Sequence, residues 1–477
     1  MSSLALKRIL FTIGGAAGLL AVVVLIAPLI VDINRFKPRL EVAASDALGM
    51  DIRVGGRLRL GFIPGLHVTI EDGRILGDQG VSVLSAKKVT LWIKVLPLLR
   101  REFRLNRIEL GQPKLSIERD SEGRLNLERS KQAAALLSVL EGASVVLSNG
   151  TLLYSDKRSG GGFEAIDCDL EVRRIRLAGG RGSQPLKGLS LEAELACGEI
   201  RAKEFSVSAL KASVDGKDGV IEFKPITMRI FGGEAAGSLR ANVSGPIPLY
   251  QLRCSLPSFR IGEFLSVLSP KKAAEGTMDF SASLSMQGGT TSQLVQTTAG
   301  EISLRGGHLT LVGNDLDLML SRFKSSQSFN LVDVAGVFLA GPLGLAATKG
   351  YSFGSLFRGT GGNCSIDTLV SDWKVQRGVA RAKDVALATT KNRIALQGGL
   401  DFVNERFAGV TVAAIDAGGC ASVRQAIRGS FENPTVEKPR VLKSLAGPAL
   451  KLYRQTRSIF PSAPCEVFYS GSVPPPR

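Results

Sequence analysis

The stretch GMDIRVGGRLRLGFIPGLHVTIEDGRIL, residues 49–76, alternates apolar residues with charged or small ones. Successive side chains of a β-strand point to opposite faces, so apolar residues two positions apart lie on the same face. The apolar residues with this spacing include Ile52, Val54, Leu66, Val68 and Ile70. The stretch therefore predicts short strands with one apolar and one charged face. Another sheet, a partner protein or lipid must cover the apolar face.

The same alternation continues towards the C-terminus. Further apolar residues in this pattern include Leu91, Ile93, Leu105, Leu115 and Ile117. Residues 136–245 alternate as well, without long helical periodicity, and Asn149-Gly150 predicts a hairpin turn between two short strands. The pattern predicts a mainly β fold with a mostly antiparallel sheet and a few short helices.

Several segments depart from the strand pattern. Asn34 to Leu48 has apolar residues near helical spacing and predicts a short amphipathic helix. The other segments with a helical pattern are residues 260–269, 292–299, 334–345 and 442–457. The last of these predicts a basic amphipathic helix, and Pro474 to Pro476 predict a disordered tail behind it.

The N-terminal region contains a long uncharged stretch. Ile9 to Val31 holds no charged residue, and about 20 apolar residues suffice for a helix to span a bilayer. A secretory signal peptide is the alternative, but its apolar core is normally only about 7–15 residues long. We therefore expect a retained transmembrane anchor. Basic residues flank both ends of the stretch, so the positive-inside rule does not orient it.

The chain is strongly basic, with a formal net charge of +17 from 60 Lys and Arg against 43 Asp and Glu. Nucleic acid or an anionic membrane surface would favour such a charge, and a solvated charged face is the plainer interpretation. Aromatic residues make up only 6% of the chain, and no nucleic-acid-binding motif accompanies the basic residues. The sequence therefore predicts no nucleic-acid partner.

The sequence contains few of the residues and motifs that catalysis usually requires. Only two histidines are present, His67 and His308, although imidazole is the usual general base and a common metal ligand. Gly350, Ser352 and Gly354 have the G-x-S-x-G spacing of a hydrolase nucleophile, but no histidine follows Ser352. We therefore expect a protein that is not an enzyme and needs no cofactor, with a hydrolase acting through Ser352 as a remote alternative.

The six cysteines are not in zinc-ligand spacing, so the sequence predicts no metal site. In an oxidising compartment they could form disulfides, and six cysteines allow fifteen connectivities. Buried free thiols are the alternative. The sequence does not choose between these states.

Several parts of the chain resemble the AsmA family. Residues 49–76 resemble the family's opening strands behind a membrane anchor. Residues 91–128 resemble its "P-L-L" segment, its paired strands and a turn that contains Glu122, Gly123 and Asn126, although Leu127 stands where the family often has Trp. Residues 300–323 resemble the start of its C-terminal conserved region, 375–414 its later strand series, and 427–439 its closing strand, in which Gly429 and Pro434 match.

This resemblance implies an inner-membrane protein with its bulk in the periplasm, and kinship with chorein-type bridge-like lipid transfer proteins. Their long, curved sheet presents an apolar groove to phospholipid acyl chains. The predicted groove-facing residues are Ile52, Val54, Leu66, Val68, Ile70, Leu91, Ile93, Leu105, Leu115 and Ile117. For each strand, the sequence does not show whether the odd-numbered or the even-numbered residues face the groove. The expected partners are phospholipid, the inner membrane and outer-membrane or periplasmic envelope proteins.

The alternative function is a non-enzymatic scaffold for outer-membrane protein assembly, in which the sheet would bind proteins instead of lipid. The pattern divides the chain into an anchor over residues 1–31, an N-terminal β-groove region over 32–245 and a C-terminal β region over 246–440. A helical insert is expected near 332–362, and the predicted basic helix and tail occupy 441–477.

Overall fold

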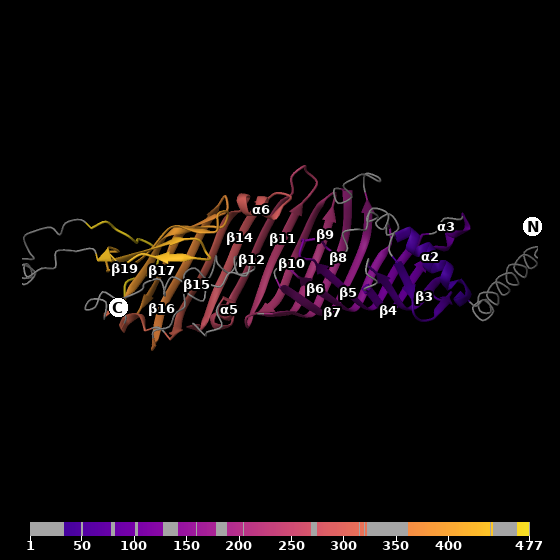
Figure 1. Cartoon of the computed structure of the whole chain (residues 1–477), viewed down its shortest axis with the longest axis horizontal. Coiled ribbons are helices and arrows are strands. Elements are labelled where there is room, and N and C mark those ends of the chain that lie inside the picture. The colour runs from indigo at the N-terminus through magenta and orange to yellow at the C-terminus, as the bar shows by residue number, and fades with distance from the viewer. Residues whose placement is uncertain are drawn as a thin grey trace, which may run out of the picture. The chain divides into compact units, whose positions relative to one another are not determined.

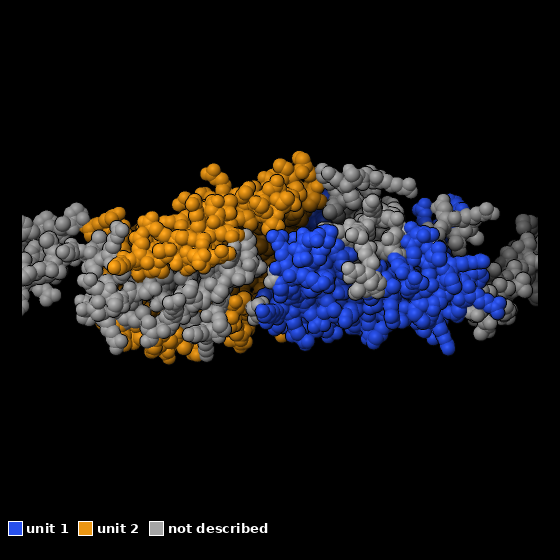
Figure 2. All heavy atoms as spheres, in the orientation of Figure 1, with its two compact units in different colours: residues 1–221 blue, residues 222–477 orange. Residues whose placement is uncertain are grey.

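The computed structural model describes residues 33–48, 51–77, 82–100, 104–126, 142–158, 160–177, 188–203, 205–268, 274–313, 315–318, 320–321, 361–438, 440–441 and 465–476. The chain forms two compact units, residues 1–221 and 222–477 (Figure 2). The boundary between them falls within a strand, whereas the sequence pattern placed a boundary at residue 245.

The described part of unit 1 consists of strands and three short helical segments (Figure 1). Its helical segments are the 3-10 helix η1 (Ile33–Phe36), α2 (Lys37–Leu48) and α3 (Val95–Leu99). Its strands are β1 (Asp51–Val54), β2 (Leu58–Gly61), β3 (His67–Leu76), β4 (Ser82–Ile93), β5 (Leu105–Arg119), β6 (Ser144–Asp156), β7 (Gly161–Leu177), β8 (Leu189–Ala202) and β9 (Ser206–Lys217). The mainly β fold with few short helices is confirmed.

The strands of unit 1 follow one another across a mixed sheet. β1 and β2 both pair with β3, and the order then runs from β3 to β9 in sequence. All these pairs are antiparallel except β5 with β6, which are parallel. The prediction of a mostly antiparallel sheet is confirmed.

The predicted hairpin at Asn149-Gly150 is wrong, because residues 144–156 form one continuous strand. Asn149 does adopt the positive φ of a turn residue, 53°, but Gly150 is not among the residues with positive φ. Both halves of β6 pair with β5 on one side and β7 on the other. Pairing along its whole length therefore outweighs the local turn preference.

Helix α2 confirms the helix predicted over Asn34 to Leu48, and it closes the free edge of the sheet at β1 and β2. Asn34 Oδ1 accepts a hydrogen bond from the amide of Leu58 at 2.9 Å, and Glu41 Oε1 accepts one from Val54 at 2.7 Å. Ser45 Oγ accepts a third from Ile52 at 2.9 Å. Side chains thus satisfy edge amides that would otherwise be open to pairing with another strand.

A crease crosses the sheet of unit 1 where the alternation of apolar residues shifts by one position. The non-glycine residues with positive φ along it are Asp72, Gln112, Asn149, Asp167 and Ala209. Such a backbone is uncommon outside glycine. At the crease, Lys87 and Lys88 are both exposed, and they line one hollow together with Glu71 and Asp72. Two consecutive residues of each of these strands therefore face the polar side.

Unit 2 contains the remaining elements. Its described helices include α5 (Ile261–Leu268) and α6 (Thr291–Thr297), at two positions where the sequence predicted short helices, and residues 316–318 and 320–321 are also helical. Its strands are β10 (Val220–Ile230), β11 (Gly233–Asn242), β12 (Leu249–Arg260), β13 (Ala274–Glu275), β14 (Thr277–Gln287), β15 (Ala299–Val312), β16 (Asn363–Gln376), β17 (Val379–Thr389), β18 (Arg393–Asp401), β19 (Arg406–Ile415), β20 (Ala421–Gly429), β21 (Pro434–Val436) and β22 (Arg440–Val441). The first two residues of β10 belong to unit 1.

The apolar face of unit 2 is covered by the unit itself. Trp373 is 1% exposed and lies in a cluster with residues from β12 and β14–β20 and from α5, whose Ile261 and Leu265 are fully buried. Phe431 closes this cluster with edge-to-face contacts to Phe402 and Phe407. Unit 2 thus has the enclosed core of an ordinary folded domain.

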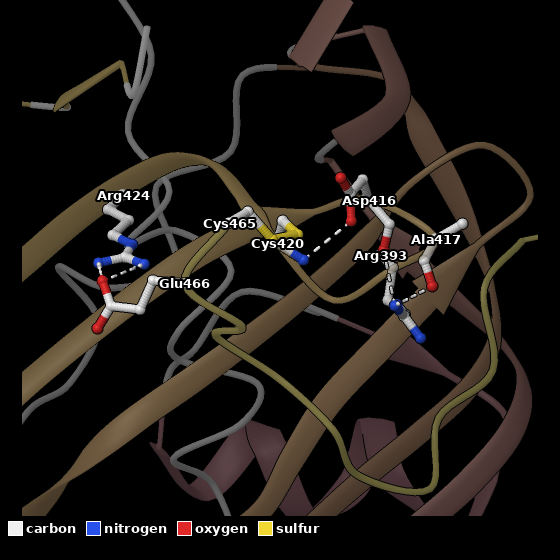
Figure 3. The surroundings of a disulfide bond; sticks show 7 residues. All are labelled: Arg393, Asp416, Ala417, Cys420, Arg424, Cys465 and Glu466. Carbon is white, nitrogen blue, oxygen red and sulfur yellow. Dashed lines mark hydrogen bonds and ion pairs between the residues drawn. A yellow bond between two sulfur atoms is a disulfide. The ribbon is translucent and has the colours of Figure 1, made fainter. Parts of the chain in front are cut away.

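The chain's last described segment, residues 465–476, covers the other face of the same strands. Phe468, Tyr469 and Val473 pack against small side chains such as Ala386 and Ala395. The Cys420–Cys465 disulfide fixes the start of the segment, as Figure 3 shows, with the Arg424–Glu466 ion pair on one side. The prediction of a disordered tail is therefore wrong for these residues, because their apolar side chains fill a second buried cluster.

Two polar groups hold this segment in place. Arg393 Nη1 donates to the carbonyl of Val473 at 3.0 Å. Asp384 accepts hydrogen bonds from the Tyr469 hydroxyl at 2.5 Å and from the amide of Ser472 at 2.9 Å. Burial raises the pKa of Asp384, but the bonds from Ser472 and Tyr469 lower it by more, so its pKa lies below 3.8. The segment is thus bound to a carboxylate.

Replacing Asp384 by asparagine should loosen residues 465–476, because the variant loses hydrogen bonds to a charged acceptor, worth about 1.5–3 kcal/mol. Hydrogen exchange at the amides of Ser472 and Val473 measures this loss. The exposed Asp367 on β16 offers the control Asp367→Asn. The pKa of Asp384 is lower in the folded protein than in the unfolded chain. Its contribution to stability is therefore complete at pH values above the unfolded-state pKa, and it is lost as the pH falls through the folded-state pKa. Equal protection in both variants would contradict this role.

Among the described residues, no helix is long and apolar enough to cross a membrane. The predicted anchor, Ile9 to Val31, lies outside these residues. So do the segment 334–345 of the predicted helical insert, the basic helix over 442–457 and Ser352.

Candidate functional site

The apolar residues of unit 1 form continuous rows across its sheet. Directly paired residues of neighbouring strands lie on the same face, so the strand register defines each row. The first row contains Leu60, Val68, Leu91, Ile108, Val145, Val172, Ala193 and Val214. The second contains Leu58, Ile70, Val89, Leu110, Leu147, Leu170, Leu195 and Ala212. Each row runs from β2 to β9.

A third row lies beyond the crease and contains Ile52, Ile75, Leu84, Leu115, Leu152, Ala165, Ile200 and Val207. We call the surface made by the three rows the apolar face of unit 1. At about 4.8 Å per strand, a row that crosses eight strands is about 34 Å long. That is about twice the hydrocarbon depth of one bilayer leaflet, which is about 15 Å.

The apolar face of unit 1 is covered less completely than the core of unit 2. Leu110, Leu147, Leu170 and Leu195 are only half-buried. In unit 2, by contrast, Leu387 and residues paired around it are fully buried. Both described buried clusters lie in unit 2. A contiguous apolar surface of this kind marks a place where something else binds.

The structure brings most of the predicted groove residues together. Val68 and Leu91 are paired in the first row, Ile70 belongs to the second, and Ile52 and Leu115 belong to the third.

The other predicted residues extend the same face or lie beside it. Ile93 pairs with Leu105, and Ile117 pairs with Tyr154. Val54 pairs with Gly73 and is only 8% exposed, as Leu105 is at 5%, so these two contribute little free surface. Leu66 precedes β3, and its carbonyl accepts a hydrogen bond from the amide of Ile93.

The sequence prediction missed the part of the apolar face on β6–β9. Leu147, Leu170 and Leu195 lie at its centre, and their strands alternate as clearly as the earlier ones. The signal for the crease was also present in the sequence. Apolar residues there are three apart instead of two, as from Ile70 to Gly73 or from Leu110 to Pro113, with polar residues between them.

The opposite face of unit 1 is polar. Val146 pairs with Glu171, and Glu171 pairs with Glu194, on this side. A hollow over β6–β9 is lined by Asp169, Glu171, Glu194 and Lys211 together with Leu147, Leu170 and Leu195 of the second row. Exposed ion pairs such as Arg173 with Glu171 and Arg201 with Glu199 also lie there. A hydrogen bond from Arg173 lowers the pKa of Glu171. Both described hollows contain charged side chains.

Four cysteines form disulfides in the structure. Cys168–Cys197 links β7 to β8 at a directly paired position, and Cys420–Cys465 links β20 to the C-terminal segment. Cys254 and Cys364 are free, and burial raises the pKa of both thiols, that of Cys364 to about 11. Such thiols are unreactive at neutral pH. The disulfides suit an oxidising compartment.

The described residues contain no group of His, Cys, Asp and Glu side chains that could hold a metal ion. His67 stacks on Trp92, and its Nδ1 lies 2.8 Å from the carbonyl of Gly65, so a structural role accounts for it. The arrangement can adsorb apolar chains on one face while its charged face stays in water.

The fold and this surface define a class of protein: a β-sheet protein in which one unit carries a long, incompletely covered apolar face and the other unit has an enclosed core. The AsmA family model matches residues 5–179 and 183–341. The chain therefore belongs to the AsmA family. No curated protein matches the chain.

Proposed function

We propose that this protein binds phospholipid acyl chains on the apolar face of unit 1 and supports lipid transport or outer-membrane homeostasis without being an enzyme. The observation that carries the proposal is the set of half-buried leucines, among them Leu110, Leu147, Leu170 and Leu195, in rows that cross the whole sheet. Membership of the AsmA family and a large β fold are consistent with such a role.

The energetics favour an apolar chain as the occupant. Each methylene removed from water gains about 0.8 kcal/mol, so even part of an acyl chain on one row gives substantial binding. The rows contain no charged side chain, so the contact requires no buried ion. The headgroup can stay near water at the rim while the chain lies across the strands.

The proposal places the protein in the inner membrane, with one transmembrane span near the N-terminus and its bulk in the periplasm. Two disulfides in the described residues support an oxidising compartment. Phospholipid and the inner membrane are the proposed partners, together with envelope proteins at either end of a transfer route.

A scaffold for outer-membrane protein assembly is the second candidate. The same apolar face could accept a β-rich or amphipathic client instead of lipid. Both functions require a contiguous apolar surface, so the two are distinguished by identifying the molecule that binds to it.

Site-specific photocrosslinking in cells provides the test. A photoreactive residue at Leu147 should capture phospholipid, whereas one at Val146 should not. These neighbours on β6 are both half-buried, but Leu147 pairs with Leu110 and Leu170 on the apolar face, whereas Val146 pairs with Glu109 and Glu171 on the polar face. Capture of protein alone at Leu147 would favour the scaffold. Capture of neither lipid nor protein there would remove both proposals.

A further inference from the structure

Helix α2 presents its polar side to the sheet and its apolar side to the surroundings. Asn34, Glu41 and Ser45 bind the edge amides of β1 and β2, so this side of the helical segment faces the sheet. At 100° per residue, Leu40 lies about 140° around the helix from Ser45. Leu40 is 45% exposed. An amphipathic helix that packs on a sheet normally has the reverse orientation.

A further large apolar side chain is exposed near Leu40. Phe36, directly before α2, is 49% exposed. Val42 is 61% exposed but lies about 160° around the helix from Leu40, on the side that carries Asp46. The hydrogen bonds that join the helical segment to the sheet come from polar side chains. Exposed aromatic and aliphatic residues in one short helix point to a binding surface.

A second exposed apolar group lies at the same end of unit 1. In α3, Val95 is 51% and Leu96 is 79% exposed, and Ile63 in the β2–β3 loop is 72% exposed. The bond from the Ile93 amide to the Leu66 carbonyl brings this loop and the start of α3 together. Figure 1 places α2 and α3 at one end of unit 1.

Basic residues surround both groups. Arg35 and Arg39 are exposed on η1 and α2, and Lys37 donates to the carbonyl of Gly56 at the edge of the sheet. Arg100 and Arg104 are exposed beyond α3. Apolar side chains flanked by Lys and Arg suit the interface of an anionic bilayer, where the basic groups bind headgroups and the apolar ones enter the acyl boundary.

The sequence before α2 indicates what binds to these exposed apolar side chains. The uncharged residues 9–31 end two positions before Ile33, where η1 begins. A bilayer that accepted that stretch would lie within reach of Phe36 and Leu40. A protein partner would not require the same coincidence of an apolar stretch, exposed apolar side chains and flanking basic residues.

We propose that α2 and α3 dock unit 1 onto the surface of an anionic phospholipid bilayer, with Phe36, Leu40 and Leu96 inserted at the level of the headgroups and upper acyl chains. This surface, the docking surface, consists of those three residues with Ile63, Val95, Arg39 and Arg100. It is separate from the apolar face of unit 1. It would hold the sheet at a fixed height on the membrane.

Depth-dependent fluorescence quenching tests the docking surface. The full chain is reconstituted into vesicles of phosphatidylcholine and phosphatidylglycerol that carry brominated acyl chains, with an environment-sensitive fluorescent amino acid at one position. Probes at Leu40 and Leu96 should be quenched by the bromolipid about threefold more than a probe at Asp46, an exposed residue of the same helix. Ile247 in unit 2, 55% exposed, provides the distant control.

The expected pattern weakens when phosphatidylglycerol is omitted, or when Arg39 and Arg100 are both replaced by glutamine. Probes at positions 40 and 96 that stay accessible to aqueous iodide would overturn the proposal. Shielding from both quenchers would also overturn it, because a protein would then be the occupant. The docking surface does not depend on lipid binding by the apolar face, and crosslinking at Leu147 measures that property independently.

Discussion

Replacing Leu147 by glutamate is expected to lower the phospholipid bound per molecule of protein by about tenfold or more, since a loss of 1.4 kcal/mol already gives a factor of ten. Leu147 lies between Leu110 and Leu170 in the second row of the apolar face. A carboxylate there would have to lose its water against an acyl chain, or prevent the chain from lying across the row. Phospholipid that copurifies with the variant, quantified by mass spectrometry, is the measurement.

The matched control is Val146→Glu. This substitution adds the same charge one residue away, on the face that already carries Glu171 and Glu194. Lipid content should stay near that of the unmodified protein. Since both residues lie in unit 1, the unfolding transition of unit 1 reports whether each variant is folded. Equal loss of lipid in both folded variants would show that the apolar face does not hold the lipid.

Replacing Trp373 by alanine is expected to lower the free energy of unfolding of unit 2 by about 3–5 kcal/mol, the range for deletion of a large buried aromatic side chain. Trp373 is 1% exposed, pairs with Ile302 and Ala382, and donates a hydrogen bond from its indole nitrogen to Ser371 Oγ at 2.7 Å. Removing it leaves a cavity in the middle of the core and takes away that hydrogen bond. Denaturant unfolding followed by circular dichroism gives the value.

Two further variants make this result specific. Trp373→Phe keeps much of the apolar volume and should lower the free energy of unfolding of unit 2 by less than Trp373→Ala does. Lys374→Ala, at the exposed neighbouring position, should change stability by less than about 0.5 kcal/mol. A loss below about 1 kcal/mol for Trp373→Ala would mean that the core of unit 2 is not packed as the structure describes.

The alternation of apolar and polar residues within single strands predicted a large part of the candidate site. Val68 and Leu91, placed on one face by spacing alone, are directly paired. The prediction failed where the backbone departs from an ideal strand. Asn149 indicated a turn, yet its positive φ marks the crease within a continuous strand, because the neighbouring strands pair along both halves of β6.

The cysteines and the C-terminal residues show the same limit. Fifteen connectivities were open in the sequence, and only the strand register brings Cys168 next to Cys197. Phe468 and Tyr469 lie in a segment whose composition indicated a tail. They are ordered because a layer of small side chains on β16–β19 accepts them, and that layer comes from strands distant in the sequence.

The sequence by itself determined the mainly β fold, the AsmA family membership and the existence of one apolar and one charged face, because alternation and local motifs depend only on neighbouring residues. The tertiary structure decided which apolar surfaces are covered. Unit 2 encloses its own, the C-terminal segment covers a second, and the described part of unit 1 leaves its leucine rows half-buried. Coverage depends on contacts between segments far apart in the chain, and no local pattern records these contacts.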